Sequence, residues 1–121
     1  MRNRILIFIL SALILLPAYA QNRSIKFQEG EWNSILKKAS KKDKLIFLDC
    51  YTSWCGPCKM LSRTVFTNDT VADFYNKNFI CVKMDMEKGE GPELAKKYNV
   101  AAYPTLLYVN GRGELVHNVT G

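Results

Sequence analysis

Long apolar runs, histidine and glycine-rich loops are scarce in this sequence, and each scarcity excludes a class of protein. The apolar run from Ile5 to Leu16 has twelve residues, whereas a helix needs about 20 to cross a bilayer. His117 is the only histidine, so the histidine pairs of many zinc sites are absent, and we expect no catalytic role for it. The sequence has no nucleotide-binding loop, so we expect no nicotinamide or flavin cofactor.

The composition is that of an ordinary globular domain. The chain has 121 residues, of which 48% are hydrophobic and 23% are charged, which is enough for one domain and not for two. The formal net charge is +6, but the lysines are spread among other residues in KKASKKDK and AKKY. Such spacing favours solvated helix faces, so we expect no nucleic-acid partner.

The first twenty residues have the pattern of a secretory signal peptide. Two arginines precede the apolar run, and Ala18-Tyr19-Ala20 forms an A-x-A cleavage site before Gln21. No cysteine follows this site directly, which argues against a lipid-anchored lipoprotein. We therefore expect a signal peptide at 1–20 and one domain at 21–121, which is periplasmic or secreted and not stably inserted in a membrane after cleavage. The alternative is an uncleaved N-terminal membrane anchor.

Apolar periodicity predicts alternating strands and helices along the rest of the chain. The predicted strands cover 24–28 at a sheet edge, 45–50, 79–84, 105–109 and 114–120, with a hairpin turn at 110–113. The predicted helices cover about 31–40 and the segments that begin at Cys55, after Asn68 and at Pro92. This order predicts an α/β fold with a mixed central sheet and helices on both faces. The side chains expected to face the core include Met60, Leu61, Val65, Val71, Phe74 and Tyr75.

Cys55 and Cys58 enclose Gly56-Pro57, and three roles compete for this pair. A structural metal site needs four ligands, and the other candidates, Cys50, Cys81 and His117, all lie in predicted strands; we therefore expect no metal. A purely structural disulfide is possible, but so small a loop restricts the unfolded chain little.

Redox exchange is the third role, and the position of the pair favours it. A cysteine at a helix N-terminus lies near unpaired N–H groups and the positive end of the helix dipole, which bring its pKa below the free value of about 8.5. The thiolate attacks a substrate disulfide, and the second thiol resolves the mixed disulfide. The spacing predicts exchange but not its direction.

The segment LDCYTSWCGPCKM resembles the active-site segment of the thioredoxin family, and the match continues in order through YPT to the terminal VTG. It covers about residues 24–121 and implies the thioredoxin fold. By this resemblance Cys55 is the exposed attacking thiol and Cys58 the buried resolving thiol. Asp49 matches a buried acid that transfers the resolving thiol's proton, and Lys83 matches a lysine beside that acid.

The resemblance also implies a substrate-binding surface formed by Trp54, Gly56, Pro57, Tyr103 and Pro104, with a cis Tyr103–Pro104 bond. Asp85, Glu87 and Glu90 are expected in a solvated loop. The family pattern continues beyond Gly121 into a final helix that is missing from this chain, so we expect uncovered apolar residues on the last strands.

These features favour an extracytoplasmic thiol-disulfide oxidoreductase that reduces protein disulfides and needs no cofactor. The segment TVFTNDTVADFYNKNFICVKMDM is similar to secreted thioredoxin modules and to the C-terminal domain of the DsbD-type electron carrier. A membrane thiol-electron carrier is therefore the implied partner, besides disulfide-bearing protein substrates. The alternatives are a disulfide oxidase or isomerase, and a redox-inert binding or chaperone module with the same fold.

Two further expectations concern the strand at 45–50. Burial in this apolar strand should raise the pKa of Asp49, and we expect this effect to outweigh the opposite effect of Lys83. If Asp49 and Lys83 share a face of the sheet, strand alternation places Cys50 and Cys81 on opposite faces. The two thiols should then not form a disulfide.

Overall fold

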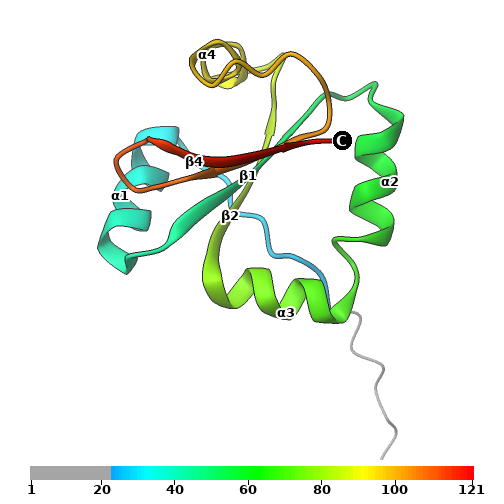
Figure 1. The fold of residues 1–121 in the computed structure, drawn as a ribbon, viewed down its shortest axis with the longest axis horizontal. Coiled ribbons are helices and arrows are strands. Elements are labelled where there is room, and N and C mark those ends of the chain that lie inside the picture. The colour runs from blue at the N-terminus through cyan, green and yellow to red at the C-terminus, as the bar shows by residue number, and fades with distance from the viewer. Residues whose placement is uncertain (1–22) are drawn as a thin grey trace, which may run out of the picture.

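A computed structural model describes residues 23–121, in which a four-stranded sheet lies between helices (Figure 1). The elements in chain order are α1 (Trp32–Lys42), β1 (Leu45–Tyr51), α2 (Gly56–Thr64), α3 (Asp69–Asn78), β2 (Phe79–Asp85), α4 (Gly91–Lys97), β3 (Thr105–Val109) and β4 (Leu115–Thr120). The signal peptide expected at 1–20 lies outside the described residues. Within 23–121, no helix has both the length and the apolar character to cross a membrane.

The sheet is mixed, as the element order predicts. Its strand order is β2-β1-β3-β4, with β1 parallel to β2 and antiparallel to β3, and with β3 and β4 joined as an antiparallel hairpin. The central strand β1 is buried along nearly its whole length, which explains its continuous apolar sequence LIFL. The arrangement is the expected thioredoxin-type architecture, with helices on both faces.

Each face of the sheet has its own hydrophobic cluster. One cluster joins α1 and α4 to the sheet through Trp32, Ile35, Leu94 and alternate residues of β1. The other joins α3 to the opposite face through Phe66, Ala72 and Phe47. Figure 1 accordingly shows α4 and α3 on opposite sides of the sheet.

Strand alternation separates the two cysteines outside the CGPC motif, as expected. Asp49 pairs with Lys83 in the parallel register of β1 and β2, and Cys81 pairs with Phe47. Cys50 lies in the cluster beneath α1 and α4, whereas Cys81 lies in the cluster beneath α3. Both thiols are buried and free.

The predicted strand at 24–28 is wrong. Its only strand-like pairing is an isolated bridge between Gln28 and Val82. The rest of the segment is not paired with a strand of the sheet. Ile25 is buried, and its N–H donates to the carbonyl of Phe66, at a distance of 2.9 Å, rather than to a strand.

Three side chains expected to face the core are exposed instead. Met60 and Phe74 are 57% and 56% exposed, because each lies two residues from the buried position of its helix, Cys58 in α2 and Ala72 in α3. Two residues turn the chain about 200° around a helix axis, so these side chains point outward. Val65, 42% exposed, lies at the C-cap of α2 beside an open groove.

The apolar residues of the last strand are uncovered, as expected. All residues of β4 are exposed, with Leu115 at 40%, Val116 at 56% and Val119 at 45%. Val119 pairs with Leu106 and His117 with Tyr108, so both lie on the face of the sheet that carries α2 and α3. His117 is thus an exposed strand residue, whose ring lies 5.8 Å from that of Tyr108.

Candidate active site

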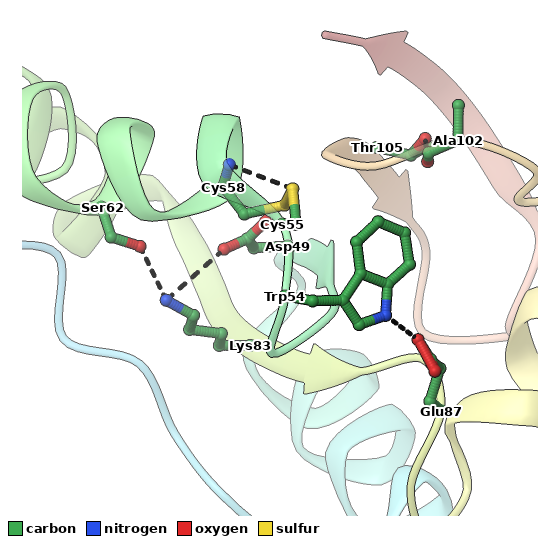
Figure 2. The surroundings of a disulfide bond; sticks show 9 residues. All are labelled: Asp49, Trp54, Cys55, Cys58, Ser62, Lys83, Glu87, Ala102 and Thr105. Carbon is green, nitrogen blue, oxygen red and sulfur yellow. Dashed lines mark hydrogen bonds and ion pairs between the residues drawn. A yellow bond between two sulfur atoms is a disulfide. The ribbon is translucent and has the colours of Figure 1, made fainter.

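The two cysteines of the CGPC motif lie where the chain passes from the central strand to α2. Cys55 is the N-cap residue of α2, and Gly56 and Pro57 form its first turn, where a proline costs no helical hydrogen bond. Cys55 and Cys58 are joined by a disulfide with their Cα atoms 5.3 Å apart (Figure 2). The structure is therefore that of the oxidised protein.

The helix N-terminus supports the sulfur of Cys55. The backbone N–H of Cys58 donates to the Cys55 Sγ, at a distance of 3.1 Å. An anion at this position gains both from the hydrogen bond and from the positive end of the helix dipole. After reduction, the same N–H group stabilises a thiolate at Cys55, which is the nucleophile that exchange requires.

The expected difference in exposure between the two cysteines is not observed in this state. Cys55 and Cys58 are each 3% exposed in the disulfide-bonded protein. The helix position, rather than exposure, distinguishes the two residues: Cys55 caps the helix and Cys58 lies within its first turn.

Asp49 lies near the end of β1, with its carboxyl group near Cys58 in Figure 2. The side chain is 1% exposed, and neither carboxylate oxygen has a hydrogen-bond partner in the described part of the chain. Loss of hydration raises the pKa of Asp49 from 3.8 to about 6, and Lys83 opposes this rise. Desolvation outweighs the ion pair, as expected.

Lys83 connects Asp49 to α2. Its ammonium group lies 3.9 Å from the Asp49 Oδ2 and donates a hydrogen bond to the Ser62 Oγ, at a distance of 2.7 Å. The ring centroids of Tyr51 and Phe27 lie 4.8 and 5.9 Å from the same nitrogen. Sequence reasoning missed Ser62, since no pattern around it indicates that its hydroxyl meets a lysine of β2.

Trp54, expected on the substrate-binding surface, is 67% exposed but is held in place by two neighbours. Its indole N–H donates a hydrogen bond to the carboxylate of Glu87, and its ring meets that of Tyr103 edge to face at a centroid distance of 6.0 Å. Glu87 is exposed, as expected of a solvated loop, but it also positions Trp54. This contact was not predicted because the loop after β2 has no periodicity that places its side chains.

Tyr103 and Pro104 are joined by a cis peptide bond, as the family resemblance implies. Pro104 lines a groove of about 700 Å³ together with Gly56 and Pro57, so the structure brings these three residues to one surface. The Pro104 carbonyl accepts a hydrogen bond from the Gly121 N–H, at 2.9 Å. The backbone N–H and carbonyl of Tyr103 have no such partner within residues 23–121.

A second cavity, of about 360 Å³, lies beside Cys58. Its lining includes Cys58, Lys59, Ser62, Arg63 and Lys83, so solvent reaches the Lys83 head group from α2. Among the described residues, no three His, Cys, Asp or Glu side chains are grouped so that they could hold a metal ion. The reactive groups that the structure places at the site are two sulfurs, a buried carboxylate and an ammonium group.

Comparison with known proteins gives a consistent set of relatives. The thioredoxin family model matches residues 23–121. Thioredoxin from Chlorobaculum thiosulfatiphilum is 34% identical over 96 residues, which are 79% of this chain and 83% of that protein. Thioredoxin H2 from Arabidopsis thaliana is 33% identical over 101 residues, 83% of this chain and 71% of that protein.

A solved structure is more similar in sequence than these relatives. It is a Bacteroides thetaiotaomicron protein described as a candidate disulphide isomerase, 55% identical to this chain with a TM-score of 0.76. The match covers 84% of each chain. Sequence and structure comparisons therefore point to the same family.

The raised pKa of Asp49 predicts a pH-dependent cost to stability. The native state binds this proton more tightly than the unfolded chain, so stability decreases as pH rises from about 3.8 to about 6 and stays lower above that range. Asp49→Asn removes the charge and should stabilise the oxidised protein at pH 8 by about 2 to 3 kcal/mol more than at pH 4. Urea unfolding at the two pH values measures the difference.

Asp43→Asn, which removes an exposed carboxylate at the end of α1, is the matched control for the loss of one acidic group. Equal effects of Asp49→Asn at pH 4 and pH 8 would contradict the burial of a charged carboxylate at this position.

The contact between Trp54 and Glu87 predicts a change in the indole N–H signal. Glu87→Ala removes the acceptor, and since one hydrogen bond contributes about 0.5 to 1.5 kcal/mol, exchange of the Trp54 Nε1 proton with solvent should accelerate about two- to tenfold. Glu87→Gln keeps an oxygen acceptor and should have a smaller effect. NMR of the indole protons measures exchange, with buried Trp32 as the internal reference.

Glu93→Ala, a change in α4 that leaves Glu87 intact, serves as the surface control. If the Trp54 proton exchanges equally fast in the parent and in Glu87→Ala, the carboxylate does not hold the ring in solution.

Proposed function

The chain belongs to the thioredoxin family and is a thiol-disulfide oxidoreductase, and from this premise we propose that it reduces protein disulfides outside the cytoplasm. One observation carries the proposal: the Cys55–Cys58 disulfide lies at the N-terminus of α2, and Cys58 shares a cavity with Lys83, the ion-pair partner of the buried Asp49 carboxylate. A structural disulfide requires neither a helix N-terminus nor a neighbouring base. Thiol-disulfide exchange uses both features, since the helix N-terminus lowers the pKa of a thiol and the base accepts a proton.

In the reducing direction, the Cys55 thiolate attacks one sulfur of a substrate disulfide. The substrate S–S bond breaks, one substrate sulfur leaves with the electron pair and takes a proton from solvent, and a mixed disulfide forms at Cys55. Cys58 then loses its proton to Asp49 and attacks the Cys55 sulfur. The second substrate thiolate leaves, and the substrate has gained the two electrons that the dithiol has lost.

The surface around the disulfide suits an extended polypeptide substrate. The unpaired N–H and carbonyl of Tyr103 can pair with the backbone of an extended segment, as in the addition of a strand to a sheet edge. Gly56, Pro57 and Pro104 line the adjacent groove, and Trp54, the residue before Cys55, is exposed. Because backbone pairing does not read side chains, such a surface accepts disulfides from many proteins.

The proposed location and electron source rest on the sequence. The pattern of residues 1–20, with its A-x-A site, supports export to the periplasm or secretion, with an N-terminal membrane anchor as the alternative. Thiols are oxidised in these compartments, so a reductase there needs a supply of electrons. We propose a membrane thiol-electron carrier as the partner that reduces Cys55–Cys58 after each cycle.

An isomerase is the second candidate, because the 55% identical Bacteroides thetaiotaomicron protein is described as a candidate disulphide isomerase. The two activities share the attack by Cys55 and differ in how the mixed disulfide is released. An isomerase releases Cys55 when another substrate thiol attacks the mixed disulfide, whereas a reductase resolves it with Cys58. The reduction potential of the cysteine pair discriminates between them.

The reduction potential of Cys55–Cys58 should lie near about −270 mV, the value typical of reducing thioredoxins, rather than near about −180 mV, as in protein disulfide isomerase. Equilibration with glutathione and dithiothreitol buffers, followed by alkylation and mass spectrometry, gives this value. A potential above about −200 mV would replace the reductase assignment with an isomerase or an oxidase.

The roles of the two cysteines and the location can be tested together. The full chain carrying Cys58→Ser, expressed in a bacterium with a periplasm, should accumulate mixed disulfides at Cys55 because the resolving thiol is absent. These adducts should be found in the periplasmic fraction, on a chain that begins at Gln21. Mass spectrometry identifies both the crosslinked cysteine and the N-terminus.

Cys55→Ser is the matched control and should form no adducts. Adducts through Cys58 in that variant would reverse the assigned roles, and a chain retaining residues 1–20 in the membrane fraction would support the anchor instead of cleavage.

A further inference from the structure

The ammonium group of Lys83 has two polar neighbours at unequal distances. The Ser62 Oγ lies 2.7 Å away and the Asp49 Oδ2 lies 3.9 Å away (Figure 2). A hydrogen bond between nitrogen and oxygen spans about 2.7 to 3.2 Å. Lys83 therefore donates to the serine but forms only an ion pair with the carboxylate, whose two oxygens have no donor among the described residues.

This arrangement is unusual for a buried carboxylate. An ionised acid and an ammonium group normally approach to about 2.7 to 2.9 Å, since the charged hydrogen bond is much stronger than a neutral one. Here the neutral hydroxyl holds the closer position. Ser62 lies on α2, one turn beyond Cys58, so the helix that carries the resolving cysteine also fixes the position of the lysine.

We propose that Ser62 is a positioning residue that holds the Lys83 ammonium group away from hydrogen-bond contact with Asp49. The consequence concerns the acid. A direct hydrogen bond from Lys83 would stabilise the charged carboxylate and lower its pKa further. By preventing that bond, Ser62 leaves desolvation as the dominant effect, which keeps the pKa of Asp49 raised, at about 6.

The surroundings of Asp49 decide where Lys83 goes without the serine. On β3 the residue opposite Asp49 is the apolar Leu106, and on α2 the disulfide-bonded Cys58 lines the same cavity as Lys83. On β1, Tyr51 lies two residues along the same face and its ring contacts the lysine nitrogen. Within residues 23–121, Lys83 is thus the cation that lowers the pKa of Asp49.

Two other carboxylates compete for the freed ammonium group. Glu29 and Asp85 line a surface pocket together with Lys83, but Glu29 is exposed to solvent, and Asp85, whose side chain is 11% exposed, already has Lys88 at 3.9 Å. Asp49 is 1% exposed, so its attraction for a cation is screened far less. In addition, Tyr51 and Phe27 hold the ammonium group on the Asp49 side of the strand. The freed lysine should therefore move toward Asp49.

The test is the pKa of Asp49 in the oxidised full-length protein, measured from its carboxyl ¹³C signal and assigned with Asp49→Asn. Ser62→Ala should lower this pKa by at least about half a unit, which is about a threefold loss of proton affinity. Ser62→Thr keeps the hydroxyl and should restore the parent value. Ser53→Ala, which removes an exposed hydroxyl from the same cavity, should have no effect.

A double variant separates positioning from a general structural role. Because Ser62 acts through the lysine, Ser62→Ala should leave the pKa of Asp49 unchanged when Lys83 is already methionine. An unchanged or higher pKa in the single variant Ser62→Ala would overturn the proposal, as would a full effect of Ser62→Ala in the Lys83→Met protein.

The functional consequence rests on the proposed role of Asp49 as proton acceptor. Resolution of a mixed disulfide should then shift its pH dependence downward in Ser62→Ala by the same amount as the pKa. If Asp49 is not the acceptor, the titration of Asp49 still moves but the pH dependence of resolution does not. Failure of the positioning role of Ser62 and failure of the proposed role of Asp49 therefore give different results.

Discussion

A carboxylate buried in the central strand is the constraint on which the active site depends. β1 is covered on both faces, so an acid placed at Asp49 loses its hydration whatever its neighbours are. The fold tolerates this cost because one cation from the adjacent strand lies nearby, in the parallel register that pairs Asp49 with Lys83. A cation in full hydrogen-bond contact would offset more of the cost but would also make the acid a weaker base. The observed distance of 3.9 Å lies between these extremes.

One face of the sheet forms an apolar core, and the other carries the charged residues of the active site. Beneath α1 and α4 the residues are almost all apolar, and even Cys50 acts there as a small hydrophobic side chain whose thiol pKa is raised to about 12 by burial and by Asp49. The face beneath α2 and α3 carries Asp49 and Lys83. A thiol with so high a pKa supplies no thiolate for exchange. Burial also raises the pKa of the Cys81 thiol, to about 11, so Cys55 and Cys58 remain as the reactive pair among the four cysteines.

Sequence patterns predicted the elements that are stabilised by local preference or continuous burial, and they failed where a single tertiary contact decides the structure. The apolar run LIFL fixes β1, and a proline in its first turn fixes the start of α2. By contrast, the segment at 24–28 alternates like a strand but has a hydrogen bond to Phe66. Ser62 and Glu87 carried no signal, because the side chains that they meet, Lys83 and Trp54, are distant in sequence. Polar contacts of this kind depend on strand register and loop shape, which cannot be predicted from the apolar periodicity of the sequence.

The carboxylate oxygens of Asp49 are unpaired in the oxidised protein. Buried polar atoms nearly always have hydrogen-bond partners, yet both oxygens of this carboxylate lack one among the described residues. Cys58, which lines the same cavity as Lys83, has no S–H group while it is bonded to Cys55. Reduction returns that S–H donor, and the proposed mechanism removes it again when the proton passes to Asp49. Because the proposed resolution step moves a proton to Asp49, the redox state of the disulfide and the protonation of Asp49 are thermodynamically linked.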